Sequence, residues 1–381
     1  MATIKPFIAL RPSAEWFEAI QPKLGSLQSL LENSQGQLSH PKIKKNLRVL
    51  KALLKRGNYQ SDQVPNMFVY EQETYQGSQF GIWVQSSLAD LHNGDVLRHE
   101  ETITENQEDL RLYRKMVGLE GSPVLLTYPR DGAINYLMER VASRPPAVNY
   151  KFDQVQHRLW EISDPSEIEN FRQAFAKLPE VFVADGHHRL AAAAATDANK
   201  GQWITSLYVS SGQLRCSPFH RLILPATAIT KKALLGALNK YYYINEIPGE
   251  VAFKPQREGR LGLYHNGSWY QLDLRHRPSS AELQADVSFL QEMILAPFFG
   301  ITDARTDRRL LSIPESRWDE LMETIAKNPD AVVFTLAAIN ADRLMYLASN
   351  NVVLPPKSTY MEPKIPFGLL MHQNKKGVAD A

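Results

Sequence analysis

Cysteine is nearly absent from this sequence. Cys216 is the single cysteine among 381 residues. One thiol cannot close a disulfide within the chain, and the sequence contains no pair of cysteines with the spacing of a zinc site. We therefore expect a protein of a reducing compartment, the cytoplasm.

Long apolar runs and a strong charge of one sign are absent as well. No uncharged apolar run reaches the roughly 18–20 residues that span a bilayer, and the N-terminus has no apolar signal region. The net charge is +2, with 44% hydrophobic and 22% charged residues. We expect a soluble globular protein that contacts no membrane and is no general nucleic-acid binder, because such binders are strongly basic.

Several catalytic and nucleotide-binding motifs are missing too. The sequence contains no Gly-x-x-x-x-Gly-Lys-Ser/Thr loop, no Gly-x-Gly-x-x-Gly fingerprint, no His-Glu-x-x-His and no Gly-x-Ser-x-Gly. These absences argue against P-loop nucleotide binding, Rossmann dinucleotide binding, zincin proteases and α/β-hydrolases.

Strand and helix patterns alternate irregularly along the chain, which favours an α+β fold of mixed β-sheets with flanking helices over a doubly wound sheet. The length suffices for two or three units. We expect an N-terminal α+β region (1–145), a core region (146–300) and a C-terminal region (301–381) whose tail returns to the site. Helices are expected over 14–33, 41–56, 167–177, 231–240, 281–297, 317–327 and 341–349, and a hairpin over 261–274 with its turn at Asn266-Gly267.

The most informative stretch is 180–195. The apolar run 181–184 predicts a short buried strand, and the alanine-rich run from Leu190 predicts a helix. Asp185, Gly186, His187, His188 and Arg189 lie between them. A strand that enters a helix through a glycine turn directs backbone N–H groups and the positive end of the helix dipole at one point, which suits phosphate. The alternative is a structural corner in which Asp185 merely caps the helix.

Four further groups of residues could contribute to a site. His99 and Glu100 precede Thr102, which with Glu105 could equally form a capping box. His220 and Arg221 lie on a predicted strand, where such a pair is usually solvated. Two lysines and two hydroxyls in the proline-rich tail could clamp a phosphate or only fasten the tail: Lys357, Ser358, Thr359 and Lys364. Arg11, which precedes Pro12, could likewise either bind a ligand or serve only the structure.

These pieces, taken together and in order, resemble a family of bacterial and protist proteins long filed as a domain of unknown function, some of which are reported as free serine kinases that use pyrophosphate. The resemblance covers nearly the whole chain. The Asp-Gly-His-His-Arg corner is also similar to the phosphate-binding corner of the ParB/sulfiredoxin fold, which archaeal ADP-dependent serine kinases share. The matching segments are Lys5-Pro6-Phe7, Ala9-Leu10-Arg11-Pro12, His99-Glu100 with Thr102 and Asp109, Ala184 to Arg189, His220-Arg221, Pro355 to Tyr360, Pro363-Lys364 and Gly368.

This resemblance implies phosphoryl transfer from pyrophosphate or a nucleotide to the hydroxyl of free L-serine, with Mg²⁺ on the donor's phosphates. The hypothesis gives catalytic roles to His99, Glu100, Asp185 and His188, with either Glu100 or Asp185 as the base, or Asp185 on Mg²⁺. Phosphate would be bound by Gly186, His187, His188, Arg189, Arg221, Lys357, Ser358, Thr359 and Lys364. Substrate would be bound by Arg11, Thr102 and His220. The sequence leaves open whether the protein forms a homo-oligomer.

Two departures from the family and three alternatives remain. The Pro-Tyr-Asp-Val motif that many relatives carry is absent, and Asp109 is followed by Leu110 where relatives have arginine. A ParB-like protein that binds phosphate or nucleotide without catalysis would use the same corner. A metal-dependent hydrolase would use His99, His187, His188 and His220. A sulfiredoxin-like redox role would need a cysteine in the corner, where the histidines stand instead.

Overall fold

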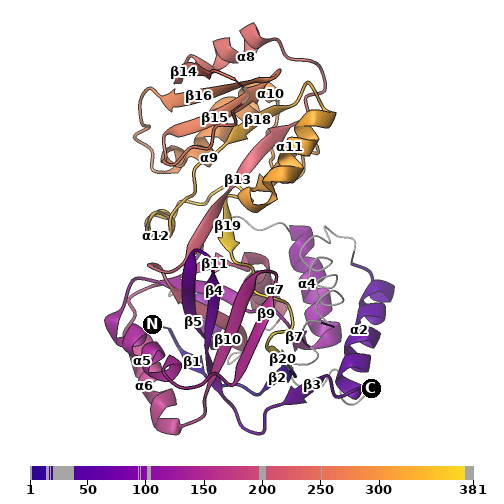
Figure 1. Cartoon of the computed structure of the whole chain (residues 1–381), viewed down its shortest axis with the longest axis vertical. Helices are drawn as coiled ribbons and strands as arrows, with labels where there is room; N and C mark the ends of the chain where they lie inside the picture. Colours follow the sequence, from indigo (N-terminus) through magenta and orange to yellow (C-terminus); the bar gives the residue numbers. More distant parts are fainter. Residues whose placement is uncertain are drawn as a thin grey trace. The chain divides into compact units, whose positions relative to one another are not determined.

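The computed structural model describes residues 2–13, 17, 19, 38–92, 94, 96–100, 104–196, 203–249 and 251–373. The chain divides into two compact units (Figure 1). Unit 1 comprises Met1–Arg98, Thr102–Leu214 and Pro363–Ala381, and unit 2 comprises His99–Glu101 and Arg215–Glu362. Each unit thus combines segments that are distant in the sequence, whereas the expected three-part division follows chain order and stays a prediction.

Unit 1 is built on a mixed sheet, which confirms the predicted α+β class. The strand order among described residues is β6-β11-β8-β12-β5-β4-β10-β9, with β1 also paired to β5. The pairs β11–β6 and β12–β8 are parallel, and the others are antiparallel. The strands are β1 (Ile4–Lys5), β4 (Met67–Thr74), β5 (Gly77–Ser87), β6 (Val96–Leu97), β8 (Val124–Tyr128), β9 (Val148–Phe152), β10 (Val155–Ile162), β11 (Val181–Asp185) and β12 (Trp203–Ser210).

Helices α5 (Gly132–Ala142) and α6 (Pro165–Ala176) pack on this sheet (Figure 1). Each begins at an aspartate cap: the Asp131 carboxylate accepts the Ile134 N–H, and Asp164 accepts the N–H groups of the first turn of α6. Their buried side chains, Ile134, Met138, Phe171 and Phe175, join an apolar cluster with residues of β4, β5, β8 and β11. Sequence patterns predicted α6 but missed α5.

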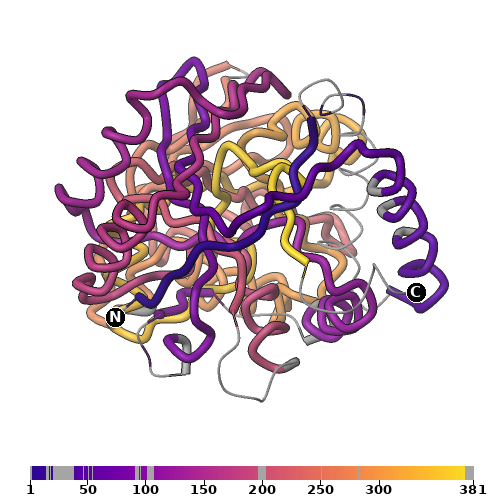
Figure 2. Tube along the Cα trace, turned by 90° about the horizontal axis from the view of Figure 1, so that it is seen from below, coloured from indigo at the N-terminus to yellow at the C-terminus, as the bar shows by residue number. Residues whose placement is uncertain are grey.

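A smaller antiparallel sheet in unit 1 brings the two ends of the described chain together. Its order is β3-β2-β20-β7, formed by β2 (Ala9–Pro12), β3 (Tyr59–Ser61), β7 (Leu119–Glu120) and β20 (Met371–Gln373). The indigo and yellow segments can be followed in Figure 2. Helices α2 (His40–Lys55) and α4 (Thr104–Val117) lie side by side in both views. Helix α3 (Ala89–His92) and helix α7 (His187–Thr196) complete the unit.

Unit 2 holds an antiparallel sheet in the order β14-β16-β15-β18-β13-β17, with β19 also paired to β13. Its elements are β13 (Arg215–Ile223), α8 (Lys231–Leu238), β14 (Tyr242–Ile247), β15 (Arg260–His265), β16 (Ser268–Leu274), η1 (Glu282–Gln284), α9 (Asp286–Leu290), η2 (Gln291–Leu295), α10 (Ala296–Phe299), β17 (Leu310–Pro314), η3 (Glu315–Arg317), α11 (Trp318–Lys327), β18 (Val332–Thr335), α12 (Ala341–Ser349) and β19 (Thr359–Glu362). The predicted hairpin is confirmed: Asn266 and Gly267 both have positive φ, as a tight primed turn requires.

Most predicted helices are found within one or two residues of their expected bounds. The segment 281–297 differs, because it breaks into η1, α9, the π-helical η2 and α10 rather than one helix. Most of the helix expected over 14–33 lies outside the described residues, and residues 17 and 19, which are described, are helical. None of the helices in the described ranges is long and apolar enough to cross a bilayer.

Candidate functional site

The Asp-Gly-His-His-Arg corner lies where β11 ends and α7 begins, as the sequence predicted. Gly186 joins them with φ of +90°, and its carbonyl accepts the N–H of Leu190 to begin the helix. A Cβ on Gly186 would lie only 2.8 Å from two guanidinium nitrogens of Arg189. A side chain at this position would therefore be strained by the backbone conformation, and the Arg189 guanidinium, which folds back over the turn, would have to move.

The Asp185 carboxylate joins the charged groups of the corner. Its Oδ1 accepts the N–H of Gly186 at 2.8 Å. Its Oδ2 lies 3.2 Å from Lys364 Nζ and 3.6 Å from Arg189 Nη2. Burial raises the pKa of Asp185, but Lys364 and Arg189 together outweigh burial and hold that pKa well below its usual range. The carboxylate is thus ionised at neutral pH, and two cations face one anion.

Lys364 reaches this corner from the proline-rich tail, 179 residues away in sequence. Gln72 on β4 holds the tail there: its amide donates to the carbonyls of Pro363 at 3.4 Å and Lys364 at 3.3 Å. Gln79 donates in turn to the Gln72 side-chain oxygen at 3.3 Å. Gln72 is buried, at 1% exposure. The lysine is therefore anchored at its backbone while its ammonium remains partly exposed.

His187 and His188 occupy the first turn of α7, where helix N–H groups have no acceptor within the helix. His187 is buried, and His188 and Arg189 are half-buried. A tetrahedral anion here would meet the N-terminal end of a ten-residue helix, the Arg189 fork and the Lys364 ammonium. The corner thus has the donors of a phosphate site.

The corner fits a metal ion less well. Both oxygens of Asp185 are already engaged, and two cations lie beside them. Magnesium prefers an octahedral shell of oxygen ligands, which this arrangement does not offer. Nor does any group of three or more His, Cys, Asp and Glu side chains gather within the described residues. The four histidines of the hydrolase alternative are divided, with His187 and His188 in unit 1 and His99 and His220 in unit 2.

Unit 2 gathers a second set of predicted residues around the turn at 355–359. Glu100 Oε1 accepts the N–H of Lys357 at 3.0 Å, and His99 Nε2 lies 3.2 Å from Thr359 Oγ1. Ser358 Oγ donates to the carbonyl of Pro355 within the turn. Lys357 has φ of +60°, a left-handed conformation that costs energy for a residue with a side chain. The hydrogen bonds to Glu100, His99 and Pro355 offset the energetic cost of the left-handed Lys357 and stabilise the turn in this conformation.

The buried side chain of Arg221 contacts the same turn. Its guanidinium donates to the carbonyls of Lys357 at 3.0 Å and Pro356 at 3.2 Å, and to Ser312 Oγ at 2.9 Å. Burial lowers the pKa of Arg221 to about 10, and Glu100 partly opposes that effect. Because Arg221 is 1% exposed, its described role is to hold the backbone of the turn. Its predicted role at phosphate stays a prediction.

The predicted substrate-binding residues His220 and Arg11 have hydrogen-bond and ion-pair partners outside the two clusters. His220 Nε2 lies 2.6 Å from Glu315, while its Nδ1 accepts the N–H of Leu336 at 3.3 Å. Arg11 on β2 pairs with Asp62 at 3.0 Å and with Glu161. Thr102 lies outside the described residues. The structure therefore brings together Asp185, Gly186, Arg189 and Lys364 in unit 1, and His99, Glu100, Arg221, Lys357, Ser358 and Thr359 in unit 2.

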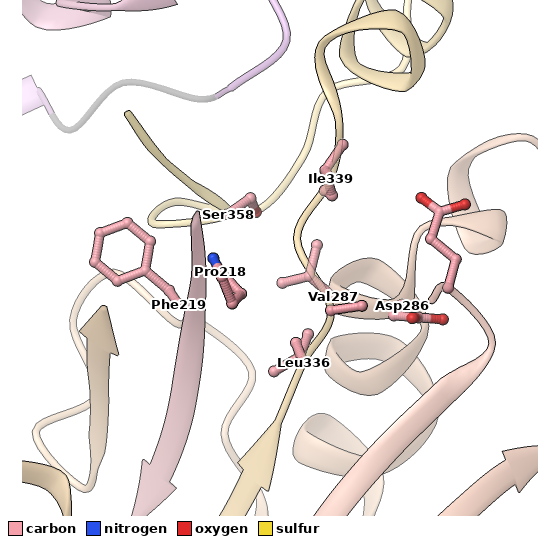
Figure 3. A pocket seen from close by; sticks show the side chains of 9 residues that line it. Pro218, Phe219, Asp286, Val287, Leu336, Ile339 and Ser358 are labelled. Carbon is pink, nitrogen blue, oxygen red and sulfur yellow. The ribbon is translucent and has the colours of Figure 1, made fainter. Parts of the chain in front are cut away.

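A pocket in unit 2 adds an acidic group that sequence reasoning missed (Figure 3). Asp286 lines it with Glu258, Ser358 and apolar side chains. Burial raises the pKa of Asp286 to about 7, although both its oxygens accept the Gly259 N–H at 2.9 and 3.0 Å. No motif marks Asp286, and none marks Gln72, because both depend on tertiary neighbours.

Comparison with solved structures finds distant likenesses. A free serine kinase in complex with AMP is 14% identical with a TM-score of 0.40, and the alignment covers 75% of this chain and 88% of that chain. A free serine kinase variant in complex with ADP is 14% identical with a TM-score of 0.41, covering 75% and 89%. SbnI with C-terminal truncation from Staphylococcus aureus is 8% identical with a TM-score of 0.40, covering 75% and 87%. TM-scores this low do not support the transfer of a function from these proteins to this chain.

Comparison with curated protein sequences finds no match. One sequence family, however, matches residues 28–293, more than half of the chain. Its description is DUF1015, a protein of unknown function. The chain therefore belongs to the DUF1015 family.

Proposed function

We propose that this protein is a small-molecule phosphotransferase that moves a phosphoryl group from pyrophosphate or a nucleotide to the hydroxyl of free L-serine. The observation that carries the proposal is the corner at Asp185–Arg189. A strand end, a left-handed glycine, a helix N-terminus, Arg189 and Lys364 converge there around one carboxylate. The motifs that resemble free serine kinases support the choice of acceptor.

The corner suits phosphoryl transfer because that chemistry depends on positioning and on neutralising charge. Arg189 can offer two parallel hydrogen bonds to a phosphate, and Lys364 supplies a point charge. The amides of the first turn of α7 contribute further donors. Together these groups would bind the donor's phosphates, as in the ParB/sulfiredoxin-like corner that the sequence resembles.

Asp185 is better suited to positioning than to proton transfer. A general base works best when its pKa lies near the working pH, and the pKa of Asp185 is held far below that. The carboxylate instead fastens the Lys364 ammonium and the Gly186 amide, and it draws Arg189 toward the turn. Glu100 is the remaining carboxylate predicted as base, and Glu100→Gln tests that role separately.

The test is formation of O-phosphoserine. Purified protein is incubated with L-serine and, in separate reactions, pyrophosphate, ADP or ATP, with and without Mg²⁺, and the product is measured by mass spectrometry. We expect phosphoserine with one of these donors. Arg189→Ala should lower kcat/KM by about 100-fold or more, the usual effect of removing one donor to the transition state.

The matched control is Arg172→Ala, which removes a half-exposed arginine of α6 in the same unit. It should leave turnover unchanged. Absence of phosphoserine with every donor contradicts the proposal. Binding of pyrophosphate or nucleotide without turnover would instead indicate the non-catalytic binding protein. Equal activity of Arg189→Ala and the wild type would show that the corner is only structural.

A further inference from the structure

Helix α2 carries an unusual concentration of positive charge. Its sixteen residues, His40–Lys55, contain six lysines and arginines and no acidic residue. The whole chain has a net charge of +2, so the remaining 365 residues sum to −4, since 2 − 6 = −4. The near-neutral total therefore conceals one strongly basic helix beside an acidic remainder.

The basic residues are aligned. Lys44, Arg48, Lys51 and Lys55 follow the spacing i, i+4, i+7 and i+11, which places them on one stripe of a helix. Lys44, Arg48 and Lys55 are exposed, and Lys51 is half-buried. The stripe is about 16 Å long at roughly 1.5 Å per residue. Lys45 and Arg56 are exposed next to it.

The apolar side of α2 is already used within unit 1. Ile43 and Leu53 are buried in an apolar cluster that includes Tyr113 and Val117 of α4. Helix α4 lies next to α2 (Figure 1). The apolar face of the helix is therefore packed against unit 1. The basic stripe is not needed for that packing, which leaves it for contacts with a partner.

We propose that this stripe binds the phosphate backbone of a double-stranded nucleic acid, in contacts that do not read sequence. Four cations on a line match the regular charge of a duplex, which carries one phosphate per roughly 1.7 Å of its axis when both strands are counted. A length of duplex equal to the stripe carries about nine phosphates on its two strands, enough for each of the four cations to contact one. Lysine and arginine contacts of this kind position a protein on a duplex without base recognition.

The composition of α2 argues against two other polyanionic partners. It contains no Phe, Tyr or Trp, on which the bases of a single strand would stack. Membrane-binding amphipathic helices bury their apolar face in the lipid boundary, whereas Ile43 and Leu53 are buried in unit 1. A duplex backbone needs neither feature.

The strength of such binding depends on salt in a calculable way. Each neutralised phosphate contributes about −0.9 to the slope of log K against log salt. Four contacts give a slope of about −3.6, or about a 100-fold loss of affinity from 50 to 200 mM salt. Removing three of the four cations should leave a slope of about −1.

The experiment measures binding of fluorescent 20-base-pair DNA and RNA duplexes by anisotropy at several salt concentrations. The test variant is Lys44→Gln with Arg48→Gln and Lys55→Gln. Glutamine is nearly as favourable in helices as lysine and arginine, and these three positions are exposed, so the variant should fold. The control is Lys232→Gln with Lys240→Gln, which neutralises exposed lysines at the helix α8 region of unit 2.

We expect the wild type and control to bind at least one duplex with equal, salt-dependent affinity, and the triple variant to lose at least 10-fold at 50 mM salt. Absence of duplex binding at 50 mM salt, or an unchanged slope in the triple variant, overturns the proposal. Binding to vesicles rich in anionic lipid but not to duplexes overturns it in favour of a membrane. Phosphoserine formation is measured in the same samples, and duplex binding is expected whether or not phosphoserine forms.

Discussion

Replacement of Asp286 by asparagine should remove a pH dependence of stability that the structure places in unit 2. Asp286 begins α9, and burial raises its pKa to about 7. Gly259 donates to its oxygens and lowers the pKa, the neighbouring Glu258 raises it, and Arg277 and Arg343 lower it. Burial dominates this balance, so the folded protein binds the proton of Asp286 more tightly than the unfolded chain does.

The direction and size of the effect follow from this difference. A folded-state pKa above the unfolded value of 3.8 contributes stability that is fully present below about pH 4 and is lost as the pH rises through 7. Between pH 5 and 8 the wild type should lose about 3 kcal/mol of unfolding free energy through this group. Asp286→Asn keeps an oxygen to accept the Gly259 N–H but cannot ionise, so this loss disappears.

The assay is urea unfolding of the wild type and Asp286→Asn at pH 5 and pH 8, followed by tryptophan fluorescence. Every other titrating group is common to the two proteins, so the change with pH in their free-energy difference isolates Asp286. The variant should gain on the wild type by about 3 kcal/mol between pH 5 and pH 8. A difference that is the same at both pH values would refute a raised pKa for Asp286.

Two further substitutions test the clusters of the candidate site. Gly186→Ala should cost about 1–2 kcal/mol of unfolding free energy, because alanine is disfavoured at a φ of +90° and its Cβ displaces Arg189; urea unfolding checks this, and an unchanged midpoint would show that the turn adapts without strain. Arg221→Met should cost about 2–4 kcal/mol, because three hydrogen bonds to Ser312 and the 356–357 carbonyls are lost; a variant as stable as the wild type would mean that the guanidinium does not hold the turn.

Local features of the fold could be predicted because their physical causes are local. The apolar run before Asp185 and the alanine-rich run after Arg189 determine a strand and a helix by themselves. Asn266-Gly267 determines its turn because both residues accept positive φ. The pairing of β2 with β20 could not be predicted, because it joins residues more than 350 positions apart and no short-range pattern encodes that contact.

The candidate site shows the same limit. Sequence identified Asp185, Gly186 and Arg189 as neighbours because they are adjacent in the chain. It offered Lys364 as one of two tail lysines that could clamp a phosphate, and it could not identify Gln72, which anchors that lysine. The sequence did not reveal that Arg221 is buried and donates to three acceptors under the turn at 355–359, and its role at phosphate stays a prediction. Burial and distant partners decide such roles, and neither is encoded in spacing.

The proposed phosphotransferase depends on phosphate binding by the Asp185–Arg189 corner together with Lys364. Isothermal titration of pyrophosphate into the wild type, Lys364→Ala and the control Arg172→Ala tests it directly. Losing one charged hydrogen bond costs about 1.5–3 kcal/mol, so Lys364→Ala should bind about 10- to 100-fold more weakly, while the control matches the wild type. An affinity for pyrophosphate that is the same in all three proteins, with Lys364→Ala folded by circular dichroism, would contradict the account.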